Sequence, residues 1–213
     1  MPSQAQAAFE SALVDVDNLM WFHENEGGDA PGRRGTHFGS LNKSAIVLLC
    51  AAWETYVESV IVECAGWNIS RAATPADMLK SIRHLVSAQV RQGKDESTWQ
   101  RVAGEGWKDL SRSVVQSRVA VLNTPKHGPV SELILNVLGV RELGNNWHWH
   151  RNPIGGPAGR LDDFVRLRGS IAHGERLPRS VTKANVTAAR DLLTRLVGAV
   201  ETRLRQERLL PRR

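Results

Sequence analysis

Thiols are scarce in this sequence of 213 residues, which contains two cysteines, Cys50 and Cys64. Both fall within one predicted helix, where their separation corresponds to about 21 Å along the axis, too far for a disulfide between them. Two thiols are also too few for a zinc site built from four cysteines. We therefore expect two small, buried and unpaired side chains.

Long apolar runs and targeting signals are also lacking. The longest uninterrupted apolar run, 45–53, ends at Glu54 and is shorter than the roughly 18 residues that span a bilayer. The first residues lack the charged start and apolar core of a signal peptide. With 41% apolar residues and a mean hydropathy of −0.31, the composition predicts a soluble globular protein, for which we expect a cytoplasmic location.

Sequence patterns of β-strands, internal repeats and interdomain linkers are not found either. Apolar and polar residues do not alternate with period two over more than a few positions, so the sequence predicts no sheet and favours an all-α fold. The chain has no P-loop, no Gly-rich dinucleotide fingerprint and no Gly-x-Ser-x-Gly elbow. We expect one all-α domain over 1–213, with a core of about 36–205 and a basic C-terminal tail, 206–213.

Helical periodicity is the pattern that the sequence does show. In the first half we expect a helix marked by Phe9, Leu13, Val16 and Met20, an exposed Gly-rich loop at 27–35, and a central buried helix at 41–65. A further helix starts at Thr74 and continues through Leu79, Ile82 and Val86, and it is followed by helices over 107–121 and 129–138, the second ended by Gly139. After an irregular stretch, 143–159, the last helix is capped by Ser180 or Thr182 and carries Ala189, Leu193, Leu196, Val200 and Leu204 on its apolar face.

The segment 168–173, Arg-Gly-Ser-Ile-Ala-His, is the most informative in the chain. It ends a helix predicted over 161–173, which Gly174 closes. The apolar stripe of that helix comprises Leu161, Phe164, Val165, Ile171 and Ala172. Arg168 falls in the middle of the stripe. Because an unpaired buried charge is very costly, its guanidinium must be paired, face a partner subunit or hold a phosphate.

His173 lies outside the stripe, in the last helical turn. The negative end of the helix dipole favours a protonated imidazole there, which suits acid–base chemistry. On a straight helix Arg168 and His173 point about 140° apart, so they do not converge on one phosphate by themselves. The alternative interpretation is a buried arginine paired with a carboxylate, followed by a histidine that only caps the helix.

Positive charge is in excess and is local. The net charge is +6 and the isoelectric point is about 9.9. Four arginines lie in 166–179 against Glu175, and five lie in 201–213 against two glutamates. A basic motif region suits a polyanion, with Arg166 and Arg176 as candidate contacts to an RNA backbone. The alternative is a solvated basic surface.

Two segments together resemble a known family. The pattern Arg-x4-His-Gly at 168–174 and the helix at 41–58 are similar to the HEPN superfamily, specifically to its RiboL-PSP type, over roughly residues 36–205. The resemblance implies an HEPN-like helical bundle with additional helices and loops. It also implies a homodimeric, metal-independent endoribonuclease without cofactor, because the attacking group is the 2′-hydroxyl of the RNA.

The resemblance also implies residue roles. His173 would deprotonate the 2′-hydroxyl or protonate the leaving 5′-oxygen, and Arg168 would stabilise charge on the scissile phosphate, in a composite site made by two protomers. Glu54 would orient the pair, with Ser170 in support; the alternative for Glu54 is a structural ion pair or an exposed face. The setting would be prokaryotic defence, as a toxin-like protein controlled by a regulatory or antitoxin protein.

Gly169 departs from the family pattern, in which the position after the motif arginine is usually Asn or Asp. The alternative function is therefore a catalytically inactive HEPN domain that binds RNA or another protein. The cluster 147–150, Trp-His-Trp-His, has no nearby Asp, Glu or Cys group to complete a metal shell, so we expect packing, or base stacking beside Arg151, and no metal.

Overall fold

The computed structural model describes residues 2–25, 37–93, 97–147 and 156–210. Helices account for the regular structure of these residues, and no strand occurs among them, which confirms the predicted all-α class. The elements are α1 (Gln4–Asn25), α2 (His37–Arg71), η1 (Pro75–Asp77), α3 (Lys80–Gln92), α4 (Ser97–Val102), α5 (Gly106–Val119), α6 (His127–Leu138), η2 (Leu143–Asn146), α7 (Gly156–Ala172) and α8 (Lys183–Gln206).

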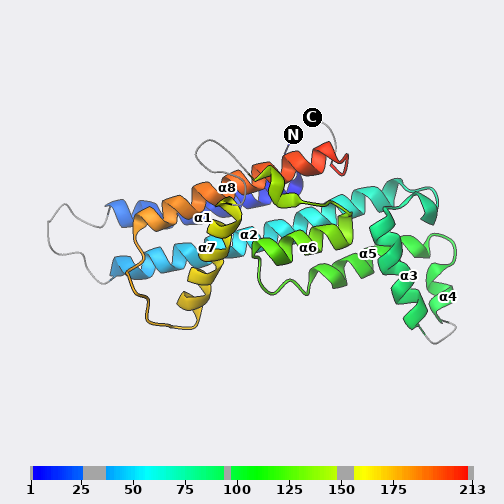
Figure 1. The fold of residues 1–213 in the computed structure, drawn as a ribbon, viewed down its shortest axis with the longest axis horizontal. Coiled ribbons are helices and arrows are strands. Elements are labelled where there is room, and N and C mark those ends of the chain that lie inside the picture. The colour runs from blue at the N-terminus through cyan, green and yellow to red at the C-terminus, as the bar shows by residue number, and fades with distance from the viewer. Residues whose placement is uncertain (1, 26–36, 94–96, 148–155, 211–213) are drawn as a thin grey trace.

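The long helix α2 is the axis of the molecule (Figure 1). Its 35 residues correspond to about 52 Å. The helices α1 and α8 run along one side of α2, while α5 and α6 pack against its C-terminal half. The helices α3 and α4 lie at its far end, and α7 crosses it nearer its N-terminal half. This arrangement puts α7 against α2, α6 and α8.

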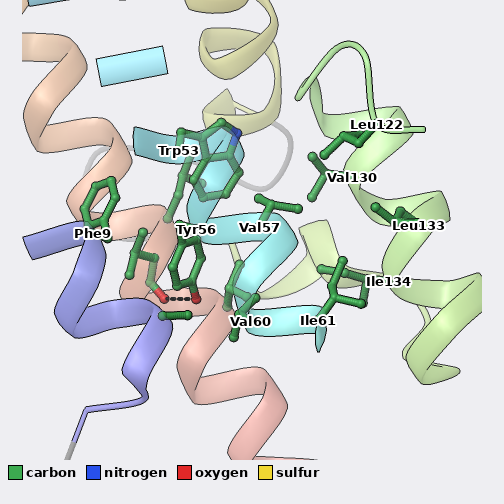
Figure 2. Close-up of a cluster of buried hydrophobic side chains, with 14 of the residues drawn as sticks. Phe9, Trp53, Tyr56, Val57, Val60, Ile61, Leu122, Val130, Leu133 and Ile134 are labelled. Atoms are coloured by element: carbon green, nitrogen blue, oxygen red, sulfur yellow. Dashed lines mark hydrogen bonds between the residues drawn. The ribbon is translucent and has the colours of Figure 1, made fainter. Parts of the chain in front are cut away.

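The core is one continuous cluster centred on α2. Figure 2 shows Val57 and Ile61 of α2 facing α6, with Phe9 and Tyr56 on the opposite side, toward α1 and α8. The Trp53 indole is fully buried, stacks on Tyr56 with ring centroids 5.8 Å apart, and donates a 2.9 Å hydrogen bond to the carbonyl oxygen of Pro125. Aromatic packing, with the Trp53 N–H satisfied, fixes the centre of the bundle.

By length and composition alone, the Gly39–Arg71 part of α2 would also pass as a membrane span. However, 56% of its most apolar window is buried against other elements of the fold. Burial on several sides is the pattern of a core helix in a bundle. The free, buried state expected for Cys50 and Cys64, which lie on this helix, is confirmed.

A buried carboxylate ties the start of the chain to the bundle. Glu201 of α8 is 4% exposed and accepts hydrogen bonds from the Ser3 and Tyr56 hydroxyls, the second drawn in Figure 2, while Arg205 pairs with its other oxygen at 2.7 Å. Glu63 of α2 accepts from the first backbone N–H groups of α1. Carboxylates at a helix N-terminus are favourable because they complement the helix dipole.

Several predicted boundaries are confirmed by local chemistry. Gly139 ends α6 with φ +75°, in the left-handed region, and Thr182 caps α8 through its hydroxyl. All five predicted apolar positions of α8 are buried. Others are corrected: α2 extends to Arg71, and the Thr74 start belongs to the short η1 because Met78 is extended and α3 begins only at Lys80.

Two further corrections concern α4 and α5. The helix α5 ends at Val119, so Val121, predicted on its apolar face, lies beyond it and is 56% exposed. The six-residue α4 was not predicted, because so short a helix has no readable periodicity. The predicted loop 27–35 lies outside the described residues.

Candidate functional site at the end of α7

The N-terminal half of α7 is firmly anchored. The helix begins at Gly156, so the predicted irregular stretch is wrong at 156–159. Pro157 occupies the first turn, where its missing N–H costs nothing. Leu161, Phe164 and Val165 are buried, and the Asp162 carboxylate accepts a 2.8 Å hydrogen bond from the His127 backbone N–H at the start of α6. Packing and this cross-helix cap fix the direction of α7.

The C-terminal half ends in a specific capping motif. Glu175 N–H donates to the Ser170 carbonyl at 2.9 Å, and Gly174 N–H donates to the Ile171 carbonyl at 3.2 Å. Gly174 has φ +66°, so the prediction that it closes the helix is confirmed. His173 is the capping residue just beyond α7 and is exposed. In Figure 1 this end of α7 extends past α2, away from α8.

The predicted apolar stripe is only partly buried. Its first three members are core residues, whereas Ile171 is half-buried and Ala172 is exposed in the single chain. The helix leaves the bundle surface in its last turn, which removes the neighbours that would cover Ala172. Arg168 lies at the transition and is half-buried.

The Arg168 guanidinium is not neutralised within the described part of the chain. Its Nε is buried and has no hydrogen-bond acceptor, and no ion pair to Arg168 is found among the described residues. The carboxylate partner that the structural alternative requires is therefore not seen there. A half-buried guanidinium whose Nε lacks an acceptor is available to bind an anion; the Arg118 Nε of α5 is likewise buried without a partner.

The charges of Arg168 and Glu54 both act on the buried Cys50 thiol. Burial raises the pKa of the Cys50 thiol to about 11; the Arg168 guanidinium lowers it and the Glu54 carboxylate raises it, each by a smaller amount. Because both charges act on one thiol, Glu54 of α2 and Arg168 of α7 belong to the same neighbourhood. Partial burial, and then the Glu54 charge, raise the pKa of Glu58 one turn further along α2. Two half-buried carboxylates thus lie on α2 where α7 crosses it.

Gly169 faces open space. A Cβ built at this position meets no atom within 4 Å, and the backbone is helical. A longer side chain therefore fits here without displacing anything. The departure from the family pattern at this position removes a polar group but does not reflect a steric requirement.

The remaining predicted residues spread around the end of α7. Arg166 is exposed and pairs with Asp163 one turn earlier, an exposed ion pair of little energetic weight. Ser170 is half-buried, and Arg176 is exposed in the segment after α7. His173, Ser170 and Arg176 are therefore brought together within a few residues, while Glu54 approaches Arg168 from α2.

The tryptophan cluster has a packing role at the one position described. Trp147 is fully buried and packs edge-on against Trp53 and against the His127 ring, whose centroid lies 5.0 Å away. His148, Trp149, His150 and Arg151 lie outside the described residues. The sequence assigned no role to His127. Its packing against Trp147 could not be predicted, because the two residues come from segments far apart in the chain.

The described residues contain no group of three or more His, Cys, Asp or Glu side chains that could hold a metal ion. The family model RiboL-PSP-HEPN matches residues 19–206 of the chain. The chain belongs to this HEPN family. The match covers α2 and α7 entirely and begins within α1, earlier than the likeness from residue 36 predicted by sequence.

No curated protein and no solved structure gives a significant match to the chain. Membership of the HEPN family indicates a role with RNA, as a nuclease or as a binding domain. It does not distinguish between these two activities, and the residues at the end of α7 carry that distinction.

Proposed function

We propose that this HEPN domain is a metal-independent endoribonuclease whose active site is the exposed end of α7. The observation that carries the proposal is the half-buried Arg168, with an unpartnered Nε, five residues before the exposed His173. A cation kept without a counter-ion destabilises the chain on its own. It gains a favourable partner when a phosphate diester is bound.

The proposed chemistry is attack of the RNA's own 2′-hydroxyl on the adjacent phosphorus. The 2′-oxygen–phosphorus bond forms as the phosphorus–5′-oxygen bond breaks, which leaves a 2′,3′-cyclic phosphate and a 5′-hydroxyl end. One His173 imidazole accepts the 2′-hydroxyl proton, and a second, protonated His173 donates a proton to the leaving 5′-oxygen. Arg168 stabilises the charge that develops on the non-bridging oxygens. No cofactor takes part.

A homodimer supplies the second histidine. On a straight helix Arg168 and His173 point about 140° apart, so one copy does not present both to one phosphate. The end of α7 extends past α2, and Ala172 there is exposed. Two such ends meeting around a two-fold axis would bring two arginines and two histidines to one phosphate and would cover the exposed turn.

Neighbouring residues are assigned supporting roles in the proposal. Glu54 orients Arg168 by charge attraction; both side chains act on the pKa of the same Cys50 thiol. Ser170 holds the capping turn through its carbonyl oxygen. Arg166 and Arg176 contact the RNA backbone, and Arg166 exchanges its weak ion pair with Asp163 for a phosphate.

The biological setting is part of the same proposal. An RNA-cutting domain with an exposed basic site requires control in the cell, which fits a toxin-like defence protein held by a regulatory or antitoxin protein in the cytoplasm. Two free, buried thiols are compatible with a reducing compartment.

A second candidate function rests on Gly169. Without a side chain at this position, the site lacks the polar group of the family pattern, and the domain would bind RNA or a protein without cleaving RNA. Because open space surrounds the Gly169 position, Gly169→Asn fits sterically. Cleavage that appears only in the Gly169→Asn protein would establish this second function for the natural chain.

The test is an analysis of product ends in EDTA. Purified protein is incubated with a labelled RNA oligonucleotide and with the same oligonucleotide carrying one 2′-deoxyribose at the cleavage position. We expect 2′,3′-cyclic phosphate ends from the first and an intact second, at a rate that EDTA leaves unchanged. Products with 3′-hydroxyl ends, or cleavage of the deoxy substrate, would contradict the proposed chemistry.

A further inference from the structure

The outward face of α3 is a stripe of three cationic side chains and one histidine, with no counter-ion on the same helix. Around the helix axis Lys80, Arg83, His84 and Arg91 fall within about 100° of one another. All four are exposed. The α3 sequence, KSIRHLVSAQVRQ, contains no Asp or Glu. Such segregation of charge on one helix face creates a local positive potential.

Packing fixes which way this face points. Ile82, on the opposite side of α3, is fully buried, and the Ser81 hydroxyl donates a 2.7 Å hydrogen bond to the Val137 carbonyl of α6. The nearest acid before α3, Asp77, accepts bonds from the Thr74 backbone and hydroxyl. Those bonds lower its pKa and hold the carboxylate on η1. The cationic stripe is therefore held outward by the fold.

The stripe is not the average surface of this protein. The helix α1, for comparison, carries four acidic residues, Glu10, Asp15, Asp17 and Glu24, and no Lys or Arg. Acidic residues thus predominate on α1 and basic residues on α3. The basic surface of α3 is at the far end of the molecule, remote from the motif arginines of α7.

The position of α3 relative to α7 suits one continuous ligand. Figure 1 shows α3 and the C-terminal end of α7 extending from the same side of α2, at different points along it. From Glu54 to Arg71 the rise of α2 is about 25 Å. On α5, which lies between, Ser113, Gln116 and Ser117 are exposed and uncharged, and Asp109 is paired with Arg112. The single acid of α5 is therefore paired, and on α6, which packs against both α3 and α7, the exposed Glu132 accepts a hydrogen bond from Asn136.

We propose that the outward face of α3 binds the phosphate backbone of an RNA strand whose scissile part occupies the α7 site. The inference rests on the proposed function and adds a second RNA-binding surface to it. RNA fits better than an acidic protein because the stripe offers Ser87 and Ala88 but no large apolar side chain, and protein interfaces depend on buried anchors. Phosphate contacts require only well-placed cations.

The distance sets a length requirement. A stacked strand advances about 3.4 Å per nucleotide, so about eight nucleotides separate the two surfaces. An oligonucleotide of four nucleotides reaches only one surface, whereas one of twenty reaches both. Dependence on RNA length is therefore the property that distinguishes an α3 contact from a general effect of charge.

The experiment measures RNA binding by fluorescence anisotropy at several salt concentrations, in a His173→Ala background that prevents cleavage. The test variant combines Lys80→Gln, Arg83→Gln and Arg91→Gln. The matched control, Arg208→Gln with Arg212→Gln and Arg213→Gln, removes the same charge from the C-terminal end. Circular dichroism verifies that both variants keep their helices.

For the twenty-nucleotide RNA we expect the α3 variant to bind at least about ten-fold more weakly near 0.1 M salt, with the log–log salt slope reduced by about two, as expected for the loss of three contacts to a single strand. For the four-nucleotide RNA we expect less than about a two-fold change. The control should bind both RNAs within about two-fold of the unmodified background.

Five results would overturn the inference. Equal weakening for both RNA lengths, or the same weakening in the control, would make the effect one of net charge. Polyglutamate competing as well as RNA would assign the face to acidic proteins. Strong binding of long RNA that ignores the α3 changes would overturn this inference alone, while no RNA binding at any length would overturn the proposed function with it.

Discussion

Trp53 and Glu54 are neighbours on α2, yet the regions that they face differ in how well their polar and charged groups are paired. Trp53 lies in a dry aromatic cluster in which its ring stacks and its N–H is bonded. Glu54 is half-buried and faces the crossing of α7, where the Arg168 Nε has no acceptor. The first region is held by packing, although the Trp147 Nε1 beside Trp53 is buried without an acceptor. The second leaves a charge uncompensated, as functional sites commonly do.

The difference teaches where to look for function in this fold. An isolated chain gains nothing from an unpaired guanidinium at the edge of its core, because its desolvation is not repaid. Two regions one residue apart on α2 therefore differ in what we assign to their side chains: one determines the structure, and in our proposal the other binds a ligand.

Replacing Trp53 with alanine should have the largest effect on stability. The change removes a fully buried indole and a hydrogen bond, and we expect a loss of about 3–5 kcal/mol in the free energy of unfolding. Urea titration followed by circular dichroism measures it. A loss below about 1 kcal/mol would show that the aromatic cluster does not hold the bundle together.

Replacing Arg168 with methionine should separate function from stability. An apolar side chain of similar length removes the unpaired charge, so we expect the free energy of unfolding to rise by about 1 kcal/mol. RNA cleavage should fall at least about 100-fold. Urea titration and a cleavage assay on the same preparation measure both. A protein that lost stability and kept its cleavage rate would reverse the comparison between the two regions.

Replacing Asp162 with alanine should have an intermediate effect. Its carboxylate is the side-chain acceptor for the first N–H of α6, since Lys126 at the capping position forms no side-chain bond. We expect a loss of about 1 kcal/mol, typical for removal of a helix cap. Thermal melting of Asp162→Ala checks it, with Asp163→Ala, which removes only an exposed ion pair, as the control. Equal losses in both variants would disprove the capping role.

The thiols should show the smallest effect at neutral pH. Cys50 and Cys64 are buried and free, so reductant should leave the melting temperature unchanged, and labelling should require unfolding. Burial raises the pKa of both thiols, that of Cys50 from 9.0 to about 11. Their protonated state therefore favours the fold below about pH 9, and this contribution is lost as pH rises toward 11. Rapid labelling of native protein at pH 7.5 would contradict this burial.

Local chemistry explains which parts of the fold the sequence could predict. Gly139, Gly174 and Thr182 end or begin helices through backbone conformation and hydrogen bonds that involve near neighbours alone. The start of α7 was missed because Gly156 and Gly159 are typical of loops. Burial of Leu161 and the bond from Asp162 to α6 stabilise a helix there, and these contacts depend on tertiary structure.

The candidate site divides in the same way. The spacing of Arg168 and His173 and the closing Gly174 are readable along the chain. That the Glu54 and Arg168 charges both act on Cys50 depends on where α7 crosses α2, which no local pattern encodes. The exposure of Ala172 depends equally on how far α7 extends past its neighbours.

The most direct test of the central claim is the rate of RNA cleavage by wild-type protein and by His173→Ala, measured in EDTA on dimers verified by light scattering. We predict that wild type cleaves and that His173→Ala, with an unchanged melting temperature, cleaves at least about 100-fold more slowly, because a proton-transfer group is lost. Equal rates in the two proteins, or a wild type that leaves every RNA intact, would contradict an active site at the end of α7.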